Sequence, residues 1–331
     1  MARAAGSVYQ DDHAGFGRPA RRTRPRTKIR PDYSALPTGR VVRIDRGRYR
    51  CLVDGVAVDA AKARSLGKRA ILVGDLVRLD GDVSGTEGTL ARVAEILPRH
   101  SVLRRSADDA DPTERPIVAN ADQLGIVTAL ADPEPRTGMI DRILVAAYSA
   151  GLTPLLCLTK ADLASPDPLL EIYGPLDIEV VTLSPGCDLA DLRRHLDGHV
   201  SVLVGHSGVG KSTLINALVP EADLPTGRVN DVTGKGRHTS TSAVALPLPT
   251  GDGWIIDTPG VRSFGLSHVD PQEIVAAFPD LAAITADCPR GCTHEATEPD
   301  CALDRAVRDG VLTAARVASF RRLPLVAASN H

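Results

Sequence analysis

The chain has 331 residues with a formal net charge of −2, and 43% of them are hydrophobic, which is enough to form ordinary globular cores. No uninterrupted apolar run approaches the ~18 to 20 residues of a transmembrane helix, and the N-terminus lacks the apolar segment of a secretory signal, so we expect a cytoplasmic protein without a membrane partner. The charge is unevenly divided: residues 1–105 carry 22 Lys and Arg against 11 Asp and Glu, and residues 106–331 carry 17 against 30. The basic part is therefore a candidate surface for binding a polyanion.

Residues 1–38 form a basic arm with almost nothing apolar to bury. Between Arg18 and Arg30 the arm has seven basic residues and no acidic ones. Because it cannot offset its ordering entropy by forming a core, we predict that it is disordered. Arg-rich arms of this kind often fold onto RNA or DNA when they bind, and the alternative is an extension that only keeps the chain soluble.

Residues 39–105 contain short runs that are rich in β-branched residues and apolar at every second position. These runs lie at 39–45, 48–55, 70–80 and 89–97, with Gly and Asp turns between them. Four or five strands in about 65 residues predict a small β-barrel of the oligonucleotide-binding (OB) type. Tyr49 is its only aromatic residue, so contacts with backbone phosphates would have to dominate over base stacking.

Residues 106–268 alternate between strand-like apolar runs and amphipathic stretches such as 139–150 and 189–196. This alternation predicts a parallel α/β sheet that binds its ligand at the carboxyl ends of the strands. Residues 269–331 are predicted to form a helical domain around a cysteine cluster, with a basic amphipathic stretch at 307–322. The candidate strands of the sheet begin at Gln123, Pro154, Asp177, Val200, Ala243 and Gly253.

The strongest motif is a phosphate-binding loop (P-loop) of the form G-x-x-x-x-G-K-S at residues 205–212. It follows the apolar run 201–204 and precedes a helix-like stretch, which is the context that this motif requires. Its backbone N–H groups would face phosphate oxygens, Lys211 would reach the β- and γ-phosphates, and Ser212 would bind Mg²⁺. The residues assigned to the nucleotide here are Gly205, His206, Ser207, Gly208, Val209, Gly210, Lys211, Ser212 and Thr213.

Two further segments have the character of nucleotide-sensing switches. Asp257-Thr-Pro-Gly260 fits a D-x-x-G motif, in which Asp257 would hold the Mg²⁺ shell through water and the Gly260 N–H would sense the γ-phosphate. Residues 234–241 form a loop rich in Gly and Thr. This loop would supply a threonine to Mg²⁺, and we assign Thr239 to that role, with Thr241 as the alternative.

A candidate base-recognition motif lies upstream, at Thr159, Lys160, Ala161 and Asp162, where guanine-specific GTPases carry N-K-x-D. The Asp162 carboxylate would accept hydrogen bonds from N1–H and N2–H₂ of guanine, and adenine offers no such pair. Lys160 would pack its aliphatic stem along the base, and Ser184 would begin the loop that touches guanine O6. These residues favour GTP, bound together with Mg²⁺, over ATP.

The order of these motifs is base recognition, P-loop, first switch and second switch, which is the order of a circularly permuted GTPase domain. Together with the barrel before it and the cysteine cluster after it, the chain resembles the family of ribosome small-subunit-dependent GTPase A (RsgA, also called YjeQ) over residues 39–322. Thr159 departs from the usual Asn of that family, and three rather than four residues lie between the first two cysteines. The resemblance rests on GHSGVGKS (205–212), GRHTST (236–241), DTPGVRSFGL (257–266) and CPRGCTH…EPDC (288–301).

The resemblance implies a multidomain α/β protein: an OB barrel at 39–105, a circularly permuted P-loop GTPase at 106–268 and a zinc-binding helical domain at 269–331. It implies a GTPase that binds the small (30S) ribosomal subunit and its 16S rRNA and hydrolyses GTP to GDP and phosphate in late subunit maturation, stimulated by the ribosome. We expect a monomer. The alternatives are a P-loop ATPase and a nucleotide-regulated RNA-binding protein without a role specific to the ribosome.

The second switch lacks the glutamine that many GTPases use in catalysis, so we look for the catalytic residue elsewhere. Val261 follows the D-T-P-G, where many GTPases use a glutamine to orient the attacking water, and a valine cannot do this. His238, in the loop 234–241, is the nearest candidate by chemistry, and the resemblance implies that it is the catalytic residue. The alternative is a solvated loop histidine without a catalytic role.

Three of the six cysteines are close together in the sequence, and a histidine lies among them. Cys288, Cys292, His294 and Cys301 offer three thiolates and one imidazole within 14 residues. Such a closed Cys₃His set suits a structural Zn²⁺ and leaves no open position for catalysis. We expect one Zn²⁺ that contributes folding energy directly, and the alternatives are buried free cysteines or a redox pair.

Overall fold

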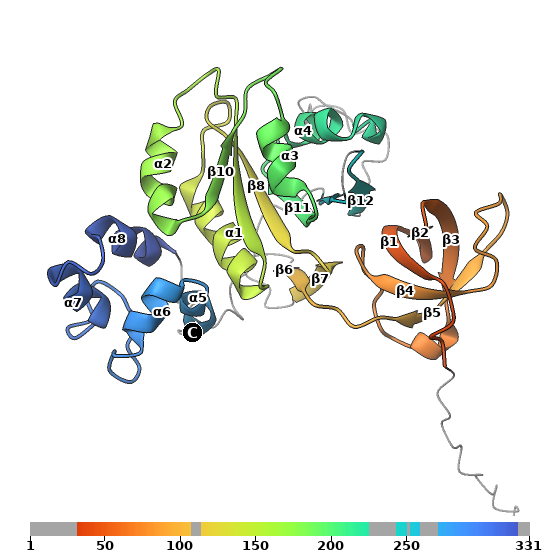
Figure 1. The fold of residues 1–331 in the computed structure, drawn as a ribbon, viewed down its shortest axis with the longest axis horizontal. Coiled ribbons are helices and arrows are strands. Elements are labelled where there is room, and N and C mark those ends of the chain that lie inside the picture. The colour runs from red at the N-terminus through yellow and green to blue at the C-terminus, as the bar shows by residue number, and fades with distance from the viewer. Residues whose placement is uncertain (1–31, 107–113, 225–242, 250–251, 259–270, 324–331) are drawn as a thin grey trace, which may run out of the picture. The chain divides into compact units, whose positions relative to one another are not determined.

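The computed structural model of the protein describes residues 32–106, 114–224, 243–249, 252–258 and 271–323. A β-barrel, an α/β sheet and a group of short helices lie within these residues (Figure 1). None of the helices in the described ranges is long and apolar enough to cross a membrane. Nearly all of the basic arm lies outside the described residues, so its predicted disorder stays a prediction.

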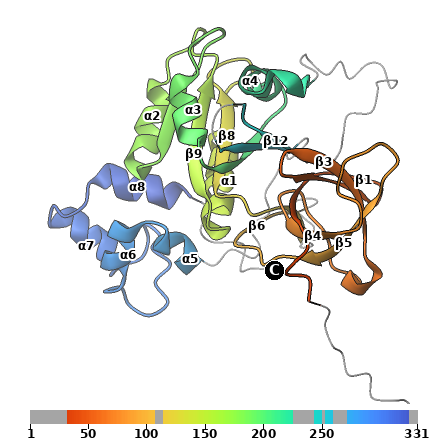
Figure 2. The same ribbon diagram turned by 45° about the vertical axis from the view of Figure 1, so that its right-hand side comes forward.

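The barrel has five strands, within the predicted range of four or five, although the four runs identified in the sequence did not separate β3. Figure 2 shows the barrel. Antiparallel pairings join β1 to β2, β2 to β3, β1 to β4 and β4 to β5, and a parallel pairing of β3 with β5 completes the barrel. The inward positions of alternate residues are filled by fully buried side chains such as Val41, Cys51 and Leu79. The strands are β1 (Thr38–Asp45), β2 (Arg48–Val53), β3 (Val56–Lys62), β4 (Leu76–Asp80) and β5 (Ala91–Ile96).

Two boundaries of the barrel strands differ from the prediction. The run 48–55 ends at Val53, because Asp54 (φ 46°) and Gly55 (φ 82°) form a two-residue turn, and β3 follows as a separate strand. The run 70–80 is too long, since only its second half is β4. The first half of the run instead forms a turn before β4, in which the fully buried carboxylate of Asp75 accepts the Leu72 N–H at 2.7 Å.

A hairpin of β6 (Val102–Ser106) and β7 (Glu114–Ala119) connects the barrel to the sheet. Val73 of the barrel forms a parallel bridge with Val118, and the adjacent Gly74 has φ 90°. A Cβ atom on Gly74 would lie 2.0 Å from the Ala119 carbonyl oxygen, so only glycine allows this close approach. The hairpin continues across the boundary that we place between residues 105 and 106.

The sheet of the GTPase region has the strand order β10-β9-β8-β11-β13-β12. The first five strands are parallel, as predicted, and β12 is antiparallel to β13. β12 also pairs with barrel strand β1 through Arg43 and Val244. The strands are β8 (Gln123–Ala129), β9 (Thr153–Thr159), β10 (Glu179–Thr182), β11 (Val200–Gly205), β12 (Val244–Pro247) and β13 (Trp254–Asp257).

Both faces of this sheet are covered by helices, which explains its continuous apolar strands. Alternate residues of each strand face opposite sides, so that Leu124 and Ile126 of β8 pack with α1 and α2 while Val127 packs with α3 and α4. The helices are α1 (Thr137–Ser149), α2 (Asp167–Tyr173), α3 (Ala190–Leu196) and α4 (Lys211–Leu218).

The C-terminal region consists of four short helices, α5 (Pro271–Ala276), α6 (Pro279–Thr285), α7 (Ala302–Arg308) and α8 (Ala314–Arg322), drawn in blue in Figure 1. The prediction of one continuous amphipathic stretch at 307–322 is wrong. Gly310 (φ 72°) interrupts it, and the Thr313 hydroxyl accepts the Arg316 N–H at 3.1 Å, so that a new helix begins after Thr313.

Helix α8 holds this helical region against the GTPase sheet. Arg316 donates to the Pro175 carbonyl at 2.5 Å and forms two hydrogen bonds with Asp280. Arg322 donates to Asp141 of α1 at 2.8 Å. Burial raises the pKa of Asp141, while hydrogen bonds from Tyr173 and Arg322 act in the opposite direction. The C-terminal helix is thereby tied to helices on one face of the sheet.

Candidate nucleotide and metal sites

The loops that the sequence assigns to the nucleotide leave the same edge of the sheet. The base-recognition residues follow β9, Ser184 follows β10, the P-loop follows β11, and Asp257 ends β13. These four strands are parallel, so their carboxyl ends and the loops after them lie together. The structure therefore brings the described candidate residues of the nucleotide site to one place.

The P-loop has the backbone conformation that a phosphate site needs. Gly208 and Gly210 have φ values of 84° and 92°, which side chains disfavour. A Cβ atom on Gly205 would lie 2.5 Å from the Val127 carbonyl oxygen of the neighbouring strand. Helix α4 begins directly afterwards at Lys211, and the N–H groups at the start of a helix are the kind of donors that bind anions.

Lys211 and Asp257 form an ion pair at this edge. Their side chains are only 13% and 12% exposed. The hydroxyl of Thr258, the next residue, donates to the Leu203 carbonyl at 3.0 Å and holds the end of β13 beside the P-loop strand. The cation assigned to the phosphates and the carboxylate assigned to the Mg²⁺ shell are thus adjacent.

Thr159 connects the base-recognition loop to the P-loop. Its hydroxyl lies 2.6 Å from the carbonyl oxygen of Val209 and 3.2 Å from that of Thr128, and the residue is only 7% exposed. The sequence assigns Thr159 to the nucleotide, but it does not reveal this contact between two loops. The hydroxyl is therefore a positioning group for the P-loop.

Substituting Thr159 by valine is expected to weaken GTP and GDP binding by about tenfold. The valine has the same shape but leaves the buried Val209 carbonyl without its donor, which costs ~1 to 3 kcal/mol. Calorimetric titration with each nucleotide measures the effect. The Thr159→Ser variant keeps the hydroxyl and should bind as the wild type does; equal affinities for the valine and serine variants would contradict this role.

The base-recognition loop is held against the loop of Ser184. The Ala161 N–H donates to the Leu183 carbonyl at 3.0 Å, and Lys160, with φ 58°, contacts the Asp132 carbonyl through its ammonium group. Asp162 is exposed at the end of the same turn. This arrangement places Asp162 and Ser184 at neighbouring strand ends, as guanine recognition requires.

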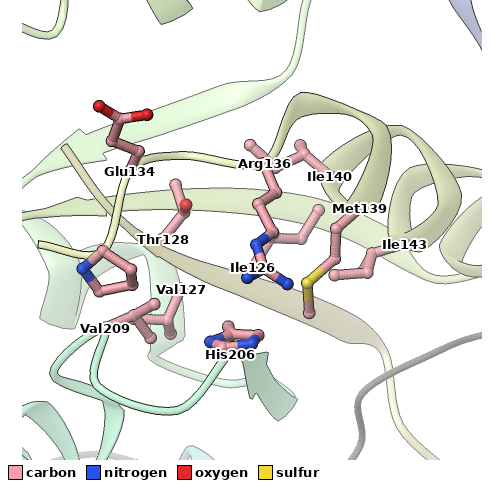
Figure 3. A pocket seen from close by; sticks show the side chains of 11 residues that line it. Ile126, Val127, Thr128, Glu134, Arg136, Met139, Ile140, Ile143, His206 and Val209 are labelled. Atoms are coloured by element: carbon pink, nitrogen blue, oxygen red, sulfur yellow. The ribbon is translucent and has the colours of Figure 1, made fainter. Parts of the chain in front are cut away.

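A small pocket of about 20 Å³ lies behind the P-loop (Figure 3). His206 and Val209 of the P-loop form one wall, and Arg136 and Met139 at the start of α1 form another. A volume of this size holds about one water molecule. The pocket is too small to hold a nucleotide.

Three assigned residues lie outside the described residues. They are His238 and Thr239 of the first switch and Gly260 of the second switch, and the alternative Thr241 lies there as well. Their assignments remain predictions.

The four residues of the predicted metal site converge in the helical region. The ligand atoms of Cys288, Cys292, His294 and Cys301 all lie within 4.8 Å of one another. His294 Nδ1 is 3.6, 3.5 and 3.9 Å from the sulfur atoms of Cys288, Cys292 and Cys301. Tetrahedral Zn²⁺ with its usual bond lengths separates nitrogen and sulfur by about 3.6 Å. The cluster can therefore hold a metal ion of this kind.

Neighbouring groups orient these ligands. The Ala302 N–H points at the Cys288 sulfur at 3.3 Å, and Arg321 donates to the His294 carbonyl at 2.8 Å. Burial, followed by the charge of Arg321, lowers the pKa of His294, which favours the neutral imidazole that binds metals. Burial raises the pKa of the Cys292 thiol to about 11, so that without a bound cation this group is a neutral thiol.

Comparison of the sequence with known proteins relates the chain to GTPases. The sequence profile described as RsgA GTPase matches residues 96–267. A protein of Pseudomonas aeruginosa (strain LESB58) named small ribosomal subunit biogenesis GTPase RsgA is 43% identical over 249 residues, which is 72% of each chain. A protein of the same name from Ectopseudomonas mendocina is 43% identical over 248 residues, covering 72% of this chain and 71% of its own.

Two solved structures are similar to this fold. The crystal structure of YjeQ from Thermotoga maritima has a TM-score of 0.64 and 27% sequence identity, covering 86% of this chain and 95% of its own. That of YloQ, described as a circularly permuted GTPase, has a TM-score of 0.63 and 27% identity, covering 87% of this chain and 93% of its own. These similarities agree with the circular permutation inferred from the order of the motifs.

Proposed function

Because the chain belongs to the RsgA GTPase family, we propose that it hydrolyses GTP in the biogenesis of the small ribosomal subunit. The observation that carries this proposal is the convergence of the P-loop, Asp257 and the base-recognition loop at one edge of a permuted sheet. We propose further that it acts late in maturation as a cytoplasmic monomer, binds 16S rRNA, and is stimulated by the subunit.

Each group in the nucleotide site has a proposed task. The N–H groups of the P-loop and the Lys211 ammonium hold the β- and γ-phosphates, and Asp162 accepts two hydrogen bonds from guanine. Ser212 and Thr239 would hold Mg²⁺, which neutralises charge on the phosphates when bound. The adjacency of Lys211 and Asp257 supports these roles. Gly260 would contact the γ-phosphate through its N–H.

We assign the metal cluster to one structural Zn²⁺ held by Cys288, Cys292, His294 and Cys301. The nitrogen–sulfur separations support tetrahedral coordination, and three thiolates with one imidazole form a typical zinc donor set. These four residues would fill all four positions of a tetrahedral ion, so the site would stabilise the helical region and take no part in hydrolysis.

Binding to the small subunit can be tested by co-sedimentation. Full-length protein with a non-hydrolysable GTP analogue is centrifuged with purified 30S or 50S subunits. We expect recovery with the 30S pellet and loss of recovery when GDP replaces the analogue. Equal recovery with 50S subunits would contradict a role specific to the small subunit.

The catalytic role of His238 gives a separate prediction. The His238→Ala variant should bind GTP with unchanged affinity but lose at least about 100-fold in turnover, the usual contribution of a positioned acid–base group. Turnover is measured with saturating GTP and 30S subunits. His199→Ala is a matched control, because His199 is exposed at the amino end of β11, opposite the nucleotide edge. Unchanged turnover in His238→Ala would exclude the catalytic role.

A further inference from the structure

The barrel carries an open cavity of about 540 Å³ that the nucleotide site does not use. Its walls come from the end of β3, the 3₁₀-helix of Arg64–Leu66, the end of β4 and strand β5. Its polar and aromatic lining consists of Tyr33, Lys62, Arg64, Ser65, Asp80 and Arg92. Three cations thus face one carboxylate, and the volume is that of a pocket for a nucleotide-sized ligand.

The positive charges of this cavity are not fully neutralised by ion pairs within the barrel. Arg92 lies 4.0 Å from Asp80, and the two side chains are 65% and 53% exposed, so this ion pair is weak. Arg64 is exposed, and Lys62 donates to the Arg69 carbonyl at 2.5 Å, which fixes its ammonium group at the wall. A carbonyl does not neutralise a charge. The cavity therefore keeps an excess of positive charge that suits phosphate groups.

The ring of Tyr33 favours a nucleic acid over an acidic peptide as the ligand, because an acidic peptide has no base to stack on it. Tyr33 is half-buried, lines the cavity, and lies three residues after Arg30, where the basic run of the arm ends. An aromatic ring beside phosphate-binding cations is the arrangement by which proteins hold single-stranded nucleic acid, with a base stacked on the ring. A base within an RNA duplex is already stacked and cannot enter.

We propose that this cavity binds a nucleotide of single-stranded RNA, with its phosphates on Arg64, Arg92 and Lys62 and its base on Tyr33. The inference rests on the proposed function, because it identifies an unpaired rRNA segment as the part of the subunit that the barrel contacts. It also gives the barrel an aromatic contact beyond Tyr49.

The test uses the full chain and a fluorescent ten-nucleotide oligouridine probe. We expect the Arg64→Gln/Arg92→Gln variant and the Tyr33→Ala variant each to weaken binding by about tenfold. Tyr33→Phe keeps the ring and should bind as the wild type does. The charge variant should also lower the slope of log affinity against log salt by about 1.4, for two lost phosphate contacts.

A control with the same change in charge is Arg46→Gln/Arg48→Gln, because these exposed residues flank the β1–β2 turn and do not line the cavity. An equal or larger loss in this control, or wild-type binding by Tyr33→Ala, would overturn the proposal. So would a polyglutamate peptide that displaces the probe as well as unlabelled RNA does. Circular dichroism checks that each variant is folded.

The wild-type protein separates this inference from the proposed function. If 30S subunits stimulate GTP turnover but the probe does not bind, the cavity proposal fails and the proposed function stands. If the probe binds through the cavity but 30S subunits have no effect on turnover, the cavity proposal stands and the proposed function fails.

Discussion

Substituting Lys211 by alanine should weaken GTP binding by at least about 100-fold and reduce turnover below detection, since charge-assisted hydrogen bonds to the β- and γ-phosphates are lost. The Lys211 ammonium already lies at the start of α4, beside the carboxylate that ends β13. Alanine cannot replace the positive charge that Lys211 would bring to the β- and γ-phosphates. Calorimetry with GTP and a turnover assay measure the two effects.

The same substitution also affects stability, and a second variant separates the two consequences. Without Lys211, the Asp257 carboxylate is left 12% exposed and without its cation, which should lower stability by up to about 3 kcal/mol. The double variant Lys211→Ala/Asp257→Asn removes that charge and should regain stability without regaining nucleotide binding. Wild-type affinity in Lys211→Ala would contradict the assigned site.

Substituting Cys301 by alanine should release the metal and unfold the helices α5 to α8. The Cys301 side chain is 2% exposed, and the residue immediately precedes α7. Binding of structural Zn²⁺ contributes ~10 to 16 kcal/mol in small zinc domains, which is comparable to the total stability of a domain. We expect a loss of zinc by elemental analysis together with a loss of helical circular dichroism.

Cys187→Ala is the matched control for this experiment. Cys187 is half-buried in the loop after β10 and is not part of the metal cluster. This variant should keep one zinc ion and the thermal stability of the wild type. Retention of both zinc and helicity by Cys301→Ala would contradict a structural metal site. Purified wild-type protein without zinc would contradict it as well.

Much of the fold is predictable from local patterns. The strands of the GTPase sheet were placed correctly because each is a short apolar run followed by a recognisable loop, as with Val200–Gly205 and the P-loop. The barrel was harder. The alternating pattern does not reveal strand β3, because Val56–Lys62 contains polar and small residues that interrupt the alternation. The turn at Asp54 and Gly55 was the available signal for it.

Other features depend on contacts between distant residues and have no local signature. Asp75 lies directly before β4, and its buried carboxylate pairs with Arg99, with 2.6 Å between Nε and Oδ1. In the nucleotide site, the motif indicated Thr159, but its hydrogen bond to Val209 joins residues 50 positions apart. The candidate metal ligands are predictable from their residue types and spacing, whereas the contact of Arg321 with His294 is visible only in the structure.

As an RsgA-family GTPase, this chain should respond to the small ribosomal subunit. The decisive measurement is steady-state GTP turnover of the full-length protein alone, with 30S subunits and with 50S subunits. We predict that 30S subunits raise turnover by at least about tenfold and that 50S subunits do not, because the partner must complete or orient the catalytic groups. Equal turnover in all three conditions would contradict the claim.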